Sequence, residues 1–341
     1  MSAQSSTRTR EVPAPQDPAG FALAIDIGGT KLAAALVSAQ GEIVAGHRVP
    51  TPDGDGEALF RALCDAIDPA LHAVGLEPEE IGGLAGVGVA TAAPMDRDAG
   101  TVSPVNIPGW RNFPLRDRLM DRYEITGIRM IGDAVAVAVA EHWRGAAQGR
   151  RNVLGMVVST GVGGGLIIDG KAVEGTTGNA GHIGHVSVDP YGPECVCGGR
   201  GCLEAIASGR SIARWAAQHG MAGAPGQAVD ERDAGAVAAA ARRGDPVALA
   251  TFRRAGEAIG MAVAGAVTLL DLDVVVIGGG VAQAGRVLFD PIDDGYARYA
   301  ALGYSSSPRV VPAVLGGDAG IVGAAAVVHR PEIYRPGSHR G

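Results

Sequence analysis

A pattern of apolar run, glycine-rich turn and second apolar run occurs twice, and it constrains the fold of this chain more than any other feature. The first copy joins FALAIDI at 21–27 to LAAALV at 32–37, and the second joins VLGMVV at 153–158 to LII at 166–168 through the glycine-rich segment 159–165. Short apolar runs bounded by glycine favour buried strands linked by tight turns. The recurrence predicts two similar α/β halves that each contain such a hairpin.

Periodic apolar residues elsewhere in the chain predict helices and further strands. Apolar residues at helical spacing predict helices over 57–74, 203–219 and 246–270. Apolar runs over 84–90 and 272–277 predict buried strands. Each half is therefore expected to combine a strand hairpin with at least one further strand and covering helices.

Three polar segments lack these patterns. The first 20 residues are polar and contain proline, so they are expected to form a disordered tail without a signal-peptide core. The segment 222–230 is rich in Gly, Pro and Ala and predicts a surface loop. The last ten residues are polar and are expected to be frayed.

Bulk composition excludes several classes of protein. The 341 residues, 47% of them apolar and 19% charged, fit a globular protein of about two domains. A net charge of −7 argues against a sequence-independent nucleic-acid binder. No uninterrupted apolar run is long enough for a transmembrane helix, so no membrane partner is expected.

The first glycine turn carries a carboxylate, two glycines, a hydroxyl and a cation: Asp26, Gly28, Gly29, Thr30 and Lys31. The glycines allow a phosphate chain to lie close to backbone N–H groups. Asp26 could hold Mg²⁺ through water, while Lys31 could neutralise phosphate charge. An ordinary turn after a buried strand explains this segment equally well when it is considered alone.

Two later glycine segments could hold other parts of a nucleotide. The second turn offers the hydroxyls of Ser159 and Thr160 with four glycines, among them Gly161, Gly163 and Gly164. A glycine-rich hairpin without a ligand is the alternative to a phosphate-binding turn. However, two such turns at matched positions in two halves are improbable by chance. A third segment, with Gly279 and Gly280 after the strand at 272–277, could let a base and ribose lie against backbone.

Asp133 follows a short apolar pair and precedes an Ala/Val run that predicts a buried helix. A carboxylate in this position is either the cap of that helix or a catalytic base at the mouth of a cleft. The two roles are compatible with each other.

Three of the four cysteines lie within eight residues of one another, and a histidine precedes them. His185, Cys195, Cys197 and Cys202 provide one imidazole and three thiolates, which can complete a tetrahedral Zn²⁺ site. Four protein ligands close the coordination shell, so the zinc is expected to be structural. Three free buried cysteines are the alternative. The clustering also suggests a reducing compartment, and hence a cytoplasmic protein.

Taken together, these motifs resemble the ROK family of sugar kinases and related repressors, over roughly 21–328. The resemblance rests on Asp26 to Lys31, Asn106-Ile107-Pro108-Gly109-Trp110, Asp133 and the segment 159–165. Its most specific part is Gly184-His185 followed by Cys195-Val196-Cys197-Gly198-Gly199-Arg200-Gly201-Cys202-Leu203-Glu204.

The resemblance implies an actin-like, ribonuclease H-like fold of two lobes, with ATP and Mg²⁺ in the cleft between them. The lobes are expected at 21–132, completed by a helix near 319–330, and at 133–318, with the zinc loop at 185–204. The implied reaction transfers the γ-phosphoryl group of ATP to a hydroxyl of a hexose or hexose-like polyol, usually the primary 6-hydroxyl. Family members are commonly homodimers or homotetramers.

The resemblance also assigns roles to individual residues. Asp133 matches the base that removes the proton of the sugar hydroxyl, and Asn106 matches a position near the sugar. His185 matches a residue that both contacts the sugar and binds zinc. Glu204 matches an acceptor for a sugar hydroxyl.

Two residues depart from the family pattern. Gly132 stands where the family usually has Asn, and His182 stands where it usually has Glu. Gly132 removes an amide that could bond a ring hydroxyl, and His182 replaces an acceptor-only carboxylate by an imidazole. We expect a changed acceptor, such as a hexose modified on the ring, an amino sugar such as kanosamine, or a C7-cyclitol of the valiolone type, with neutral drift as the alternative.

The same departures motivate a second hypothesis, a sugar-sensing regulator without catalysis. Retention of Asp133 and of both phosphate turns argues against it. A DNA-bound repressor is not expected, because only about 20 polar residues precede Phe21, too few for a helix-turn-helix module.

Overall fold

The structure is a computed structural model that describes residues 17–104, 106–176, 179–221, 234–306 and 309–334. They form two compact units, Met1–Ile131 and Gly132–Gly341. The predicted loop at 222–230 and residues 1–16 of the tail predicted over 1–20 lie outside the described residues. The end of that tail is ordered, because Pro18–Gly20 forms a 3-10 turn capped by Asp17. Within the described ranges, no helix is both long enough and apolar enough to cross a membrane.

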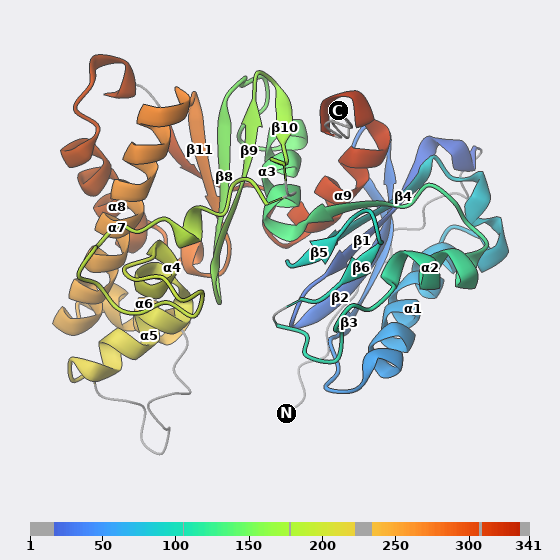
Figure 1. Cartoon of the computed structure of the whole chain (residues 1–341), viewed down its shortest axis with the longest axis horizontal. Helices are drawn as coiled ribbons and strands as arrows, with labels where there is room; N and C mark the ends of the chain where they lie inside the picture. Colours follow the sequence, from blue (N-terminus) through green and yellow to red (C-terminus); the bar gives the residue numbers. More distant parts are fainter. Residues whose placement is uncertain (1–16, 105, 177–178, 222–233, 307–308, 335–341) are drawn as a thin grey trace. The chain divides into compact units, whose positions relative to one another are not determined.

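The first unit is built on a five-stranded sheet (Figure 1), whose strand order is β3 (Ile43–Pro50), β2 (Lys31–Ser38), β1 (Phe21–Ile27), β4 (Gly86–Thr91) and β7 (Arg129–Gly132). Strands β1 and β2 pair antiparallel as the predicted hairpin, and β4 lies parallel to β1. β1 is almost entirely buried, as expected for a central strand with helices or strands around it.

The second unit repeats this arrangement. Its sheet has the order β10 (Lys171–Val173), β9 (Val162–Ile168), β8 (Val153–Val158), β11 (Val274–Gly278) and β12 (Arg309–Pro312). Strands β8 and β9 form the antiparallel hairpin, while β11 lies parallel to β8. The prediction of two similar α/β halves from the recurring sequence pattern is therefore confirmed.

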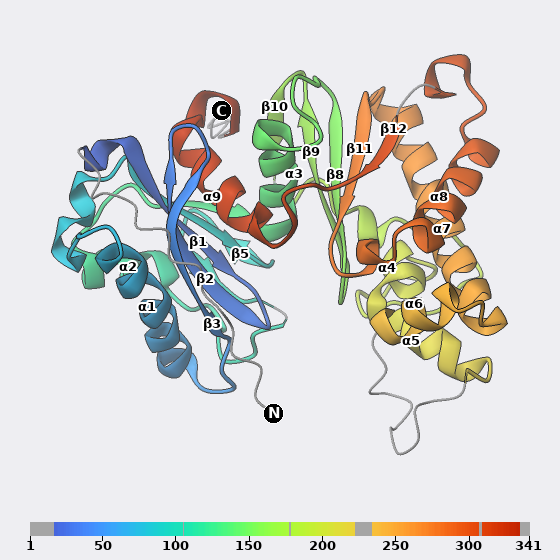
Figure 2. The ribbon, with the colours of Figure 1, turned by 180° about the vertical axis from the view of Figure 1, so that it is seen from behind.

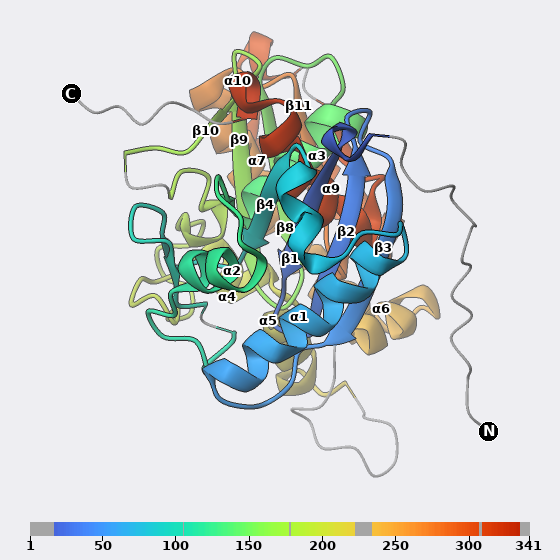
Figure 3. The same ribbon diagram turned by 90° about the vertical axis from the view of Figure 1, so that its right-hand side faces the viewer.

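Short helices and one long helix cover the sheet of the first unit. They are η1 (Pro18–Gly20), α1 (Gly56–His72), η2 (Pro78–Gly83) and α2 (Leu115–Tyr123), and the small hairpin β5 (Met95–Asp96) and β6 (Thr101–Val102) lies among them. Figure 3 shows α1 lying along the sheet. The Asp55 carboxylate caps α1 by accepting a hydrogen bond from the Ala58 amide, and the apolar face of α1 joins the core.

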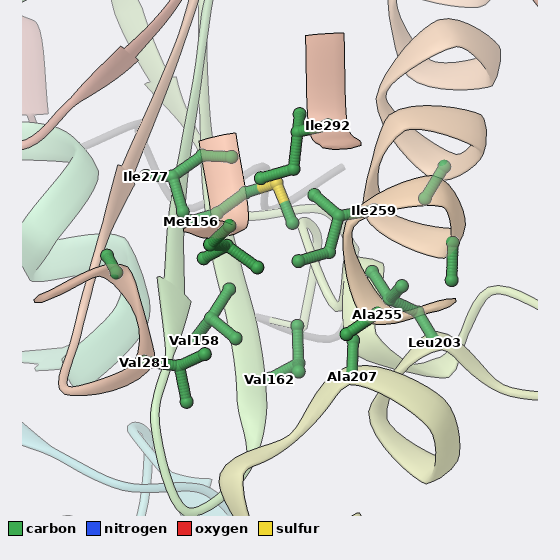
Figure 4. Close-up of a cluster of buried hydrophobic side chains, with 14 of the residues drawn as sticks. Met156, Val158, Val162, Leu203, Ala207, Ala255, Ile259, Ile277, Val281 and Ile292 are labelled. Atoms are coloured by element: carbon green, nitrogen blue, oxygen red, sulfur yellow. The ribbon is translucent and has the colours of Figure 1, made fainter. Parts of the chain in front are cut away.

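The helices of the second unit divide between the two faces of its sheet, as Figures 1 and 2 show. They are α3 (Asp133–Arg144), η3 (Ile183–His185), α4 (Leu203–Ala207), α5 (Gly209–Gln218), α6 (Ala234–Arg242), α7 (Pro246–Leu270), η5 (Val281–Ala284), α8 (Arg286–Tyr299), η6 (Gly303–Ser306), η7 (Gly316–Asp318), α9 (Ala319–His329) and α10 (Pro331–Tyr334). Helices α4 to α8 enclose the larger core with alternate residues of β8, such as Met156 and Val158 (Figure 4). Helix α3 lies on the other face and packs against α9.

Glycines in β8 and β9 allow α3 to lie directly on the sheet. A Cβ atom added to Gly155 would lie 2.5 Å from the Cα atom of Ala138, and one added to Gly165 would lie 2.6 Å from the Cα atom of Val135. The glycine-rich segment 159–165 is therefore a turn only at its start, and its later glycines belong to β9. Their absent side chains are required by the packing of α3.

Two further differences separate the sequence-based prediction from the structure. The helix predicted over 203–219 is two helices, α4 and α5, which meet at Ser208, where the backbone is extended and the hydroxyl caps α5. The last ten residues were expected to be frayed, but 332–334 belong to the helical turn Pro331–Tyr334, while 335–341 lie outside the described residues. Tyr334 is buried, and its hydroxyl lies 2.7 Å from Nδ1 of His142.

Candidate functional site

In the first unit, the turn between β1 and β2 is held in shape by backbone hydrogen bonds. The Gly28 amide donates to the carbonyl of Lys31, over 3.0 Å. Thr51, directly after β3, braces the turn: its hydroxyl donates to the Gly28 carbonyl and its amide donates to the Thr30 carbonyl, over 2.6 and 3.2 Å. These bonds fix the shape of the turn, which agrees with its prediction as a phosphate-binding turn.

Asn106 lies against this turn. A Cβ atom on Gly29 would be 2.7 Å from Nδ2 of Asn106, so only glycine leaves room for that amide. Asp26 is the penultimate residue of β1, next to the turn, and Lys31 begins β2. The structure therefore brings together the first predicted phosphate turn and the residue predicted to lie near the sugar.

In the second unit, Ser159 to Gly161 form the turn between β8 and β9, and the Ser159 amide donates to the Gly161 carbonyl. The third glycine segment lies beside this turn. Gly279 has a positive φ of 95°, and a Cβ atom there would lie 2.3 Å from the Val158 carbonyl oxygen. Gly280 lies near the hydroxyl of Ser159. The second and third predicted nucleotide segments thus meet at the ends of the parallel strands β8 and β11.

Other predicted residues of the second turn differ in their surroundings. Thr160 is exposed at the tip. Gly163 and Gly164 lie in β9, where added Cβ atoms would meet Ala134 and Gly181 at 2.8 Å. Close packing explains the absence of side chains at these two positions, and their contact with phosphate stays a prediction.

Glu204, at the start of α4, is hydrogen-bonded to the second turn. Its Oε2 atom accepts from the Val162 amide over 2.8 Å. A Cβ atom on Gly161 would lie 2.6 Å from the same oxygen. Glu204 was predicted to accept a sugar hydroxyl, and its bond to Val162 is a second use of this carboxylate that the sequence did not reveal.

Asp133 is the first residue of α3, and Gly132 holds the N-cap position. Its Oδ1 atom accepts from the Ala134 amide over 2.7 Å. Solvent reaches the side chain, yet protein atoms surround its carboxylate closely. This partial burial raises the pKa of Asp133 above its usual value, against the opposing effects of the Ala134 amide and of His182. A carboxyl group with a raised pKa is a stronger proton acceptor, which suits a general base.

The three cysteines and the histidine form a compact cluster in the segment between β10 and α4. The ligand atoms of His185, Cys195, Cys197 and Cys202 all lie within 4.8 Å of one another. The Cys197 and Cys202 sulfurs are 3.7 Å apart, and the Cys195 sulfur lies 3.8 Å from Nδ1 of His185. Ligands about 2.3 Å from a tetrahedral Zn²⁺ ion are separated by about 3.8 Å, so the donor set and its spacing fit zinc.

The two thiols that approach each other in this cluster differ in acidity. The Gly199 amide donates to Cys197 and lowers the pKa of its thiol, whereas burial raises the pKa of the Cys202 thiol to about 12. Since a metal binds the thiolate, binding in this cluster would displace protons.

His182 is exposed and stacks on His185 with ring centroids 6.3 Å apart. Its Nδ1 atom lies 2.9 Å from the Asn179 carbonyl oxygen, which therefore accepts from the ring. His182 also lines an apolar groove of about 500 Å³ between the segment 181–188 and the C-terminal half of α7. The unusual histidine thus lies next to Asp133, to the cluster and to this groove.

Some contacts around the site carry no local sequence signal. Glu141 in α3 is fully buried, where its two carboxylate oxygens accept hydrogen bonds from the amides of Ala146, Val314 and Leu315. These bonds fix the segment that leads from β12 into α9. Thr51 and the Val162 amide were missed for the same reason, because their partners are distant in sequence.

Comparisons with known proteins agree with this geometry. A model of the ROK family matches residues 22–331. The chain is 35% identical to a glucokinase of Thermotoga maritima over 90% of this chain and 96% of that one. It is 39% identical to an N-acetylmannosamine kinase of Escherichia fergusonii over 77% of this chain and 84% of that one.

A solved structure gives the same picture of the fold. A ROK family glucokinase from Streptomyces griseus, in complex with glucose and AMPPNP, superimposes with a TM-score of 0.76 and 35% identity, covering 90% of this chain and 99% of that chain. The predicted fold class, an actin-like two-lobed sugar kinase fold, is confirmed.

Proposed function

The chain belongs to the ROK family, and from this membership we propose that it transfers the γ-phosphoryl group of ATP to the primary hydroxyl of a hexose-like polyol. Its class, an ATP-dependent sugar kinase, follows from the glucokinases and N-acetylmannosamine kinases to which it is similar. The acceptor and the roles of single residues are the proposal.

The position and raised pKa of the Asp133 carboxylate are the observation that supports the proposal. A carboxylate with a raised pKa at the first turn of a helix can take the proton of an acceptor hydroxyl as the phosphoryl group moves. In this proposal the turns at Gly28–Thr30 and Ser159–Gly161 hold the phosphates through backbone amides, and Mg²⁺ bound through Asp26 balances their charge. Catalysis would then come mainly from positioning and charge stabilisation.

The proposed acceptor differs from glucose because of Gly132 and His182. Gly132 has no side chain to bond a ring hydroxyl, and its φ of −65° would also suit an asparagine. His182 offers an imidazole whose Nδ1 atom is already bonded to the Asn179 carbonyl, where a carboxylate would only accept. A site that lacks partners for a hydroxyl discriminates against substrates that need them. We favour an amino sugar such as kanosamine or a C7-cyclitol.

Structural zinc completes the proposal. His185, Cys195, Cys197 and Cys202 would hold the ion and shape the segment from η3 to α4. His185 would also touch the sugar, while Glu204 and Asn106 would bind its hydroxyls. When bound, zinc supplies a cross-link between these segments and takes no part in the chemical step, since all four ligands come from the protein.

A coupled ADP-release assay over a panel of acceptors tests the proposal. Glucose, mannose, N-acetyl hexosamines, kanosamine and C7-cyclitols are compared at equal concentration with ATP and Mg²⁺. We expect turnover with at least one modified acceptor to exceed turnover with glucose. Silence on every acceptor, with sugar binding retained, would instead support the sugar-sensing regulator.

Replacing the two unusual residues tests their part in acceptor choice. In Gly132→Asn combined with His182→Glu, we expect kcat/KM for glucose to rise about tenfold relative to the modified acceptor, because hydrogen-bond partners are restored. His47→Glu makes the same chemical change at an exposed position on β3 and is the matched control. Equal ratios in all three proteins would refute the role of these positions.

We also propose that the protein is a homodimer or homotetramer. The apolar groove beside α7 suits this assembly, because Leu269 is 81% and Val186 is 46% exposed there. Light scattering on a sizing column gives the mass directly. Leu269→Asp is expected to lower it, and Ile43→Asp, at another exposed apolar residue, is the control.

A further inference from the structure

The segment that follows the last cysteine is fastened to the second glycine turn at two points. The Glu204 carboxylate accepts from the Val162 amide over 2.8 Å. The Gly209 amide, at the start of α5, donates to the Ser159 carbonyl over 2.7 Å. One bond therefore holds each side of the turn, and both come from the chain within seven residues of Cys202.

Packing in the hydrophobic core also fixes the end of the turn, through the side chain of Val162. Val162 is buried and points into the larger core of the second unit with Leu203 and Ala207 of α4, as Figure 4 shows. Since Val162 is the first residue of β9 after the turn, its side chain and its amide are both held by α4.

The histidine arm of the cluster reaches Val162 as well. A Cβ atom on Gly184 would lie 2.0 Å from the Val162 carbonyl oxygen, so η3, which carries His185, packs on this backbone. The Leu203 amide donates to the Val186 carbonyl and ties the two arms together. Both arms of the His/Cys cluster thus converge on Val162, the residue that directly follows the glycine turn.

We propose that Glu204 is a positioning residue for the second glycine turn, through which the state of the His/Cys cluster sets the affinity for the nucleotide phosphates. The inference rests on the proposed phosphate-binding role of Ser159–Gly161. Glu204 would then have two roles. It would contact the sugar, as the family resemblance implies, and its Oε2 atom would position the turn by accepting from the Val162 amide. The cluster is then coupled to nucleotide binding as well as to sugar binding.

Two substitutions at Glu204 separate these tasks. Glu204→Gln can still present an oxygen to the Val162 amide, whereas Glu204→Ala cannot. We expect Glu204→Ala to weaken AMPPNP binding, measured by calorimetry without sugar, by about tenfold, and Glu204→Gln to stay within about twofold of the unchanged protein. Both variants are expected to raise KM for the sugar, so a selective effect on the nucleotide identifies the positioning task.

Hydrogen exchange measures how well the turn is ordered when no nucleotide is present. The peptide that covers 159–165 should exchange faster in Glu204→Ala, but not in Glu204→Gln. Removing zinc from the unchanged protein with a chelator should also speed exchange in this peptide. Chelation should weaken AMPPNP binding less in Glu204→Ala than in the unchanged protein, because the link is already broken there.

A double-mutant cycle with Gly161 tests the contact itself. In the unchanged background, Gly161→Ala places a Cβ atom 2.6 Å from Oε2 of Glu204 and should displace the carboxylate. In the Glu204→Ala background the same methyl group meets no carboxylate, so Gly161→Ala should cost much less nucleotide affinity. Additive effects would overturn the proposal.

The outcomes also distinguish this inference from the proposed function. Unchanged exchange at 159–165 in Glu204→Ala, with AMPPNP bound as tightly as by the unchanged protein, overturns the positioning role and leaves the kinase proposal intact. If the unchanged protein bound no AMPPNP, the proposed nucleotide role of the turn would fail together with the coupling, whereas the exchange measurements would still report the contact between Glu204 and the turn.

Discussion

At the scale of single residues, Asp133 combines a constrained position with an altered acidity. It begins α3, its Oδ1 atom accepts from the next amide, and its second oxygen is left for an acceptor hydroxyl in the proposed reaction. Partial burial raises its pKa even though a helix N-terminus and His182 favour the charged form. The burial of the carboxylate therefore has an energetic cost, which the catalytic role proposed for Asp133 would account for.

Asp133→Asn should separate function from stability. The amide cannot take a proton, so kcat is expected to fall by at least about a hundredfold, the contribution of a general base. Binding of AMPPNP and of the acceptor should change little. The thermal midpoint at neutral pH should rise, because an uncharged group replaces a crowded carboxylate. Stopped turnover assays and thermal scans on the same preparation check both parts.

The pH dependence of stability follows from the raised pKa. In the folded protein Asp133 holds its proton more tightly than in the unfolded chain. The associated stability is present below the unfolded pKa and is lost as the pH rises through the higher folded value. The stability advantage of Asp133→Asn should therefore appear above that range and vanish in acid. An equal advantage at all pH values, or wild-type turnover, would contradict the assignment of Asp133.

The sequence predicted those residues of the site whose role follows from their own type and their neighbours in the chain. The cysteine spacing predicted the cluster, and the glycines after strands predicted the turns, because ligand type and backbone freedom are properties of the residues themselves. The hydrogen bonds of Glu141 and of the Val162 amide were not predicted from the sequence. An ordinary helix glutamate becomes a buried acceptor of three amides only after the segments around Ala146 and Val314 fold against it.

At the scale of elements, the packing of α3 on its sheet explains the single glycine of β8 and the glycines of β9. Gly155 and Gly165 face the Cα atoms of Ala138 and Val135, with no room for a methyl group. The backbones of helix and sheet consequently approach more closely than side chains would allow. That approach sets the position of Asp133 at the beginning of α3.

Gly155→Ala should therefore destabilise the protein by about 1–3 kcal/mol, the usual effect of an added methyl group in a packed core. Gly265→Ala, in α7, is the matched control, because a Cβ atom there meets nothing within 4 Å. It should stabilise α7 by up to about 1 kcal/mol, since alanine favours helix more than glycine does. Denaturant unfolding of both variants measures the two effects, and equal signs would refute this account of α3 packing.

Element boundaries were less predictable than element types. Apolar spacing alone gave one helix over 203–219, because α4 and α5 share a buried side. The break at Ser208 depends on a hydroxyl that caps α5 by accepting from Ser211, a start signal that periodicity does not record. The turn at Pro331–Tyr334 depends on one aromatic residue that packs far back along the chain, against His142.

At the scale of the whole molecule, the two units share one arrangement of strands and one way of stabilising the hairpin turn. Each places an antiparallel hairpin beside a parallel strand, and each hairpin turn is braced by a residue distant in sequence, Thr51 in the first unit and Glu204 in the second. Within the described residues, only the second brace belongs to the segment of the His/Cys cluster, which holds zinc in the proposed function. The stability of the second unit is therefore expected to depend on zinc, while that of the first is not.

Metal analysis and chelation test this dependence. The purified protein should contain about one zinc ion per chain, and chelation should lower its thermal midpoint by several degrees, because binding to the folded cluster contributes to folding. Cys202→Ser should lose the ion and show the lowered midpoint without chelator. Cys64→Ser removes a half-buried cysteine outside the cluster and should keep both zinc and its response to chelator.

The location of the destabilisation decides between a local and a global role for the ion. After chelation, hydrogen exchange should accelerate in the segments around η3, α4 and the turn Ser159–Gly161, whereas β1 and β2 of the first unit should keep their protection. Uniform acceleration through both units would mean that zinc stabilises the molecule as a whole. No acceleration anywhere, with zinc removed, would show that the hydrogen bonds of Glu204 and Gly209 hold the turn without it.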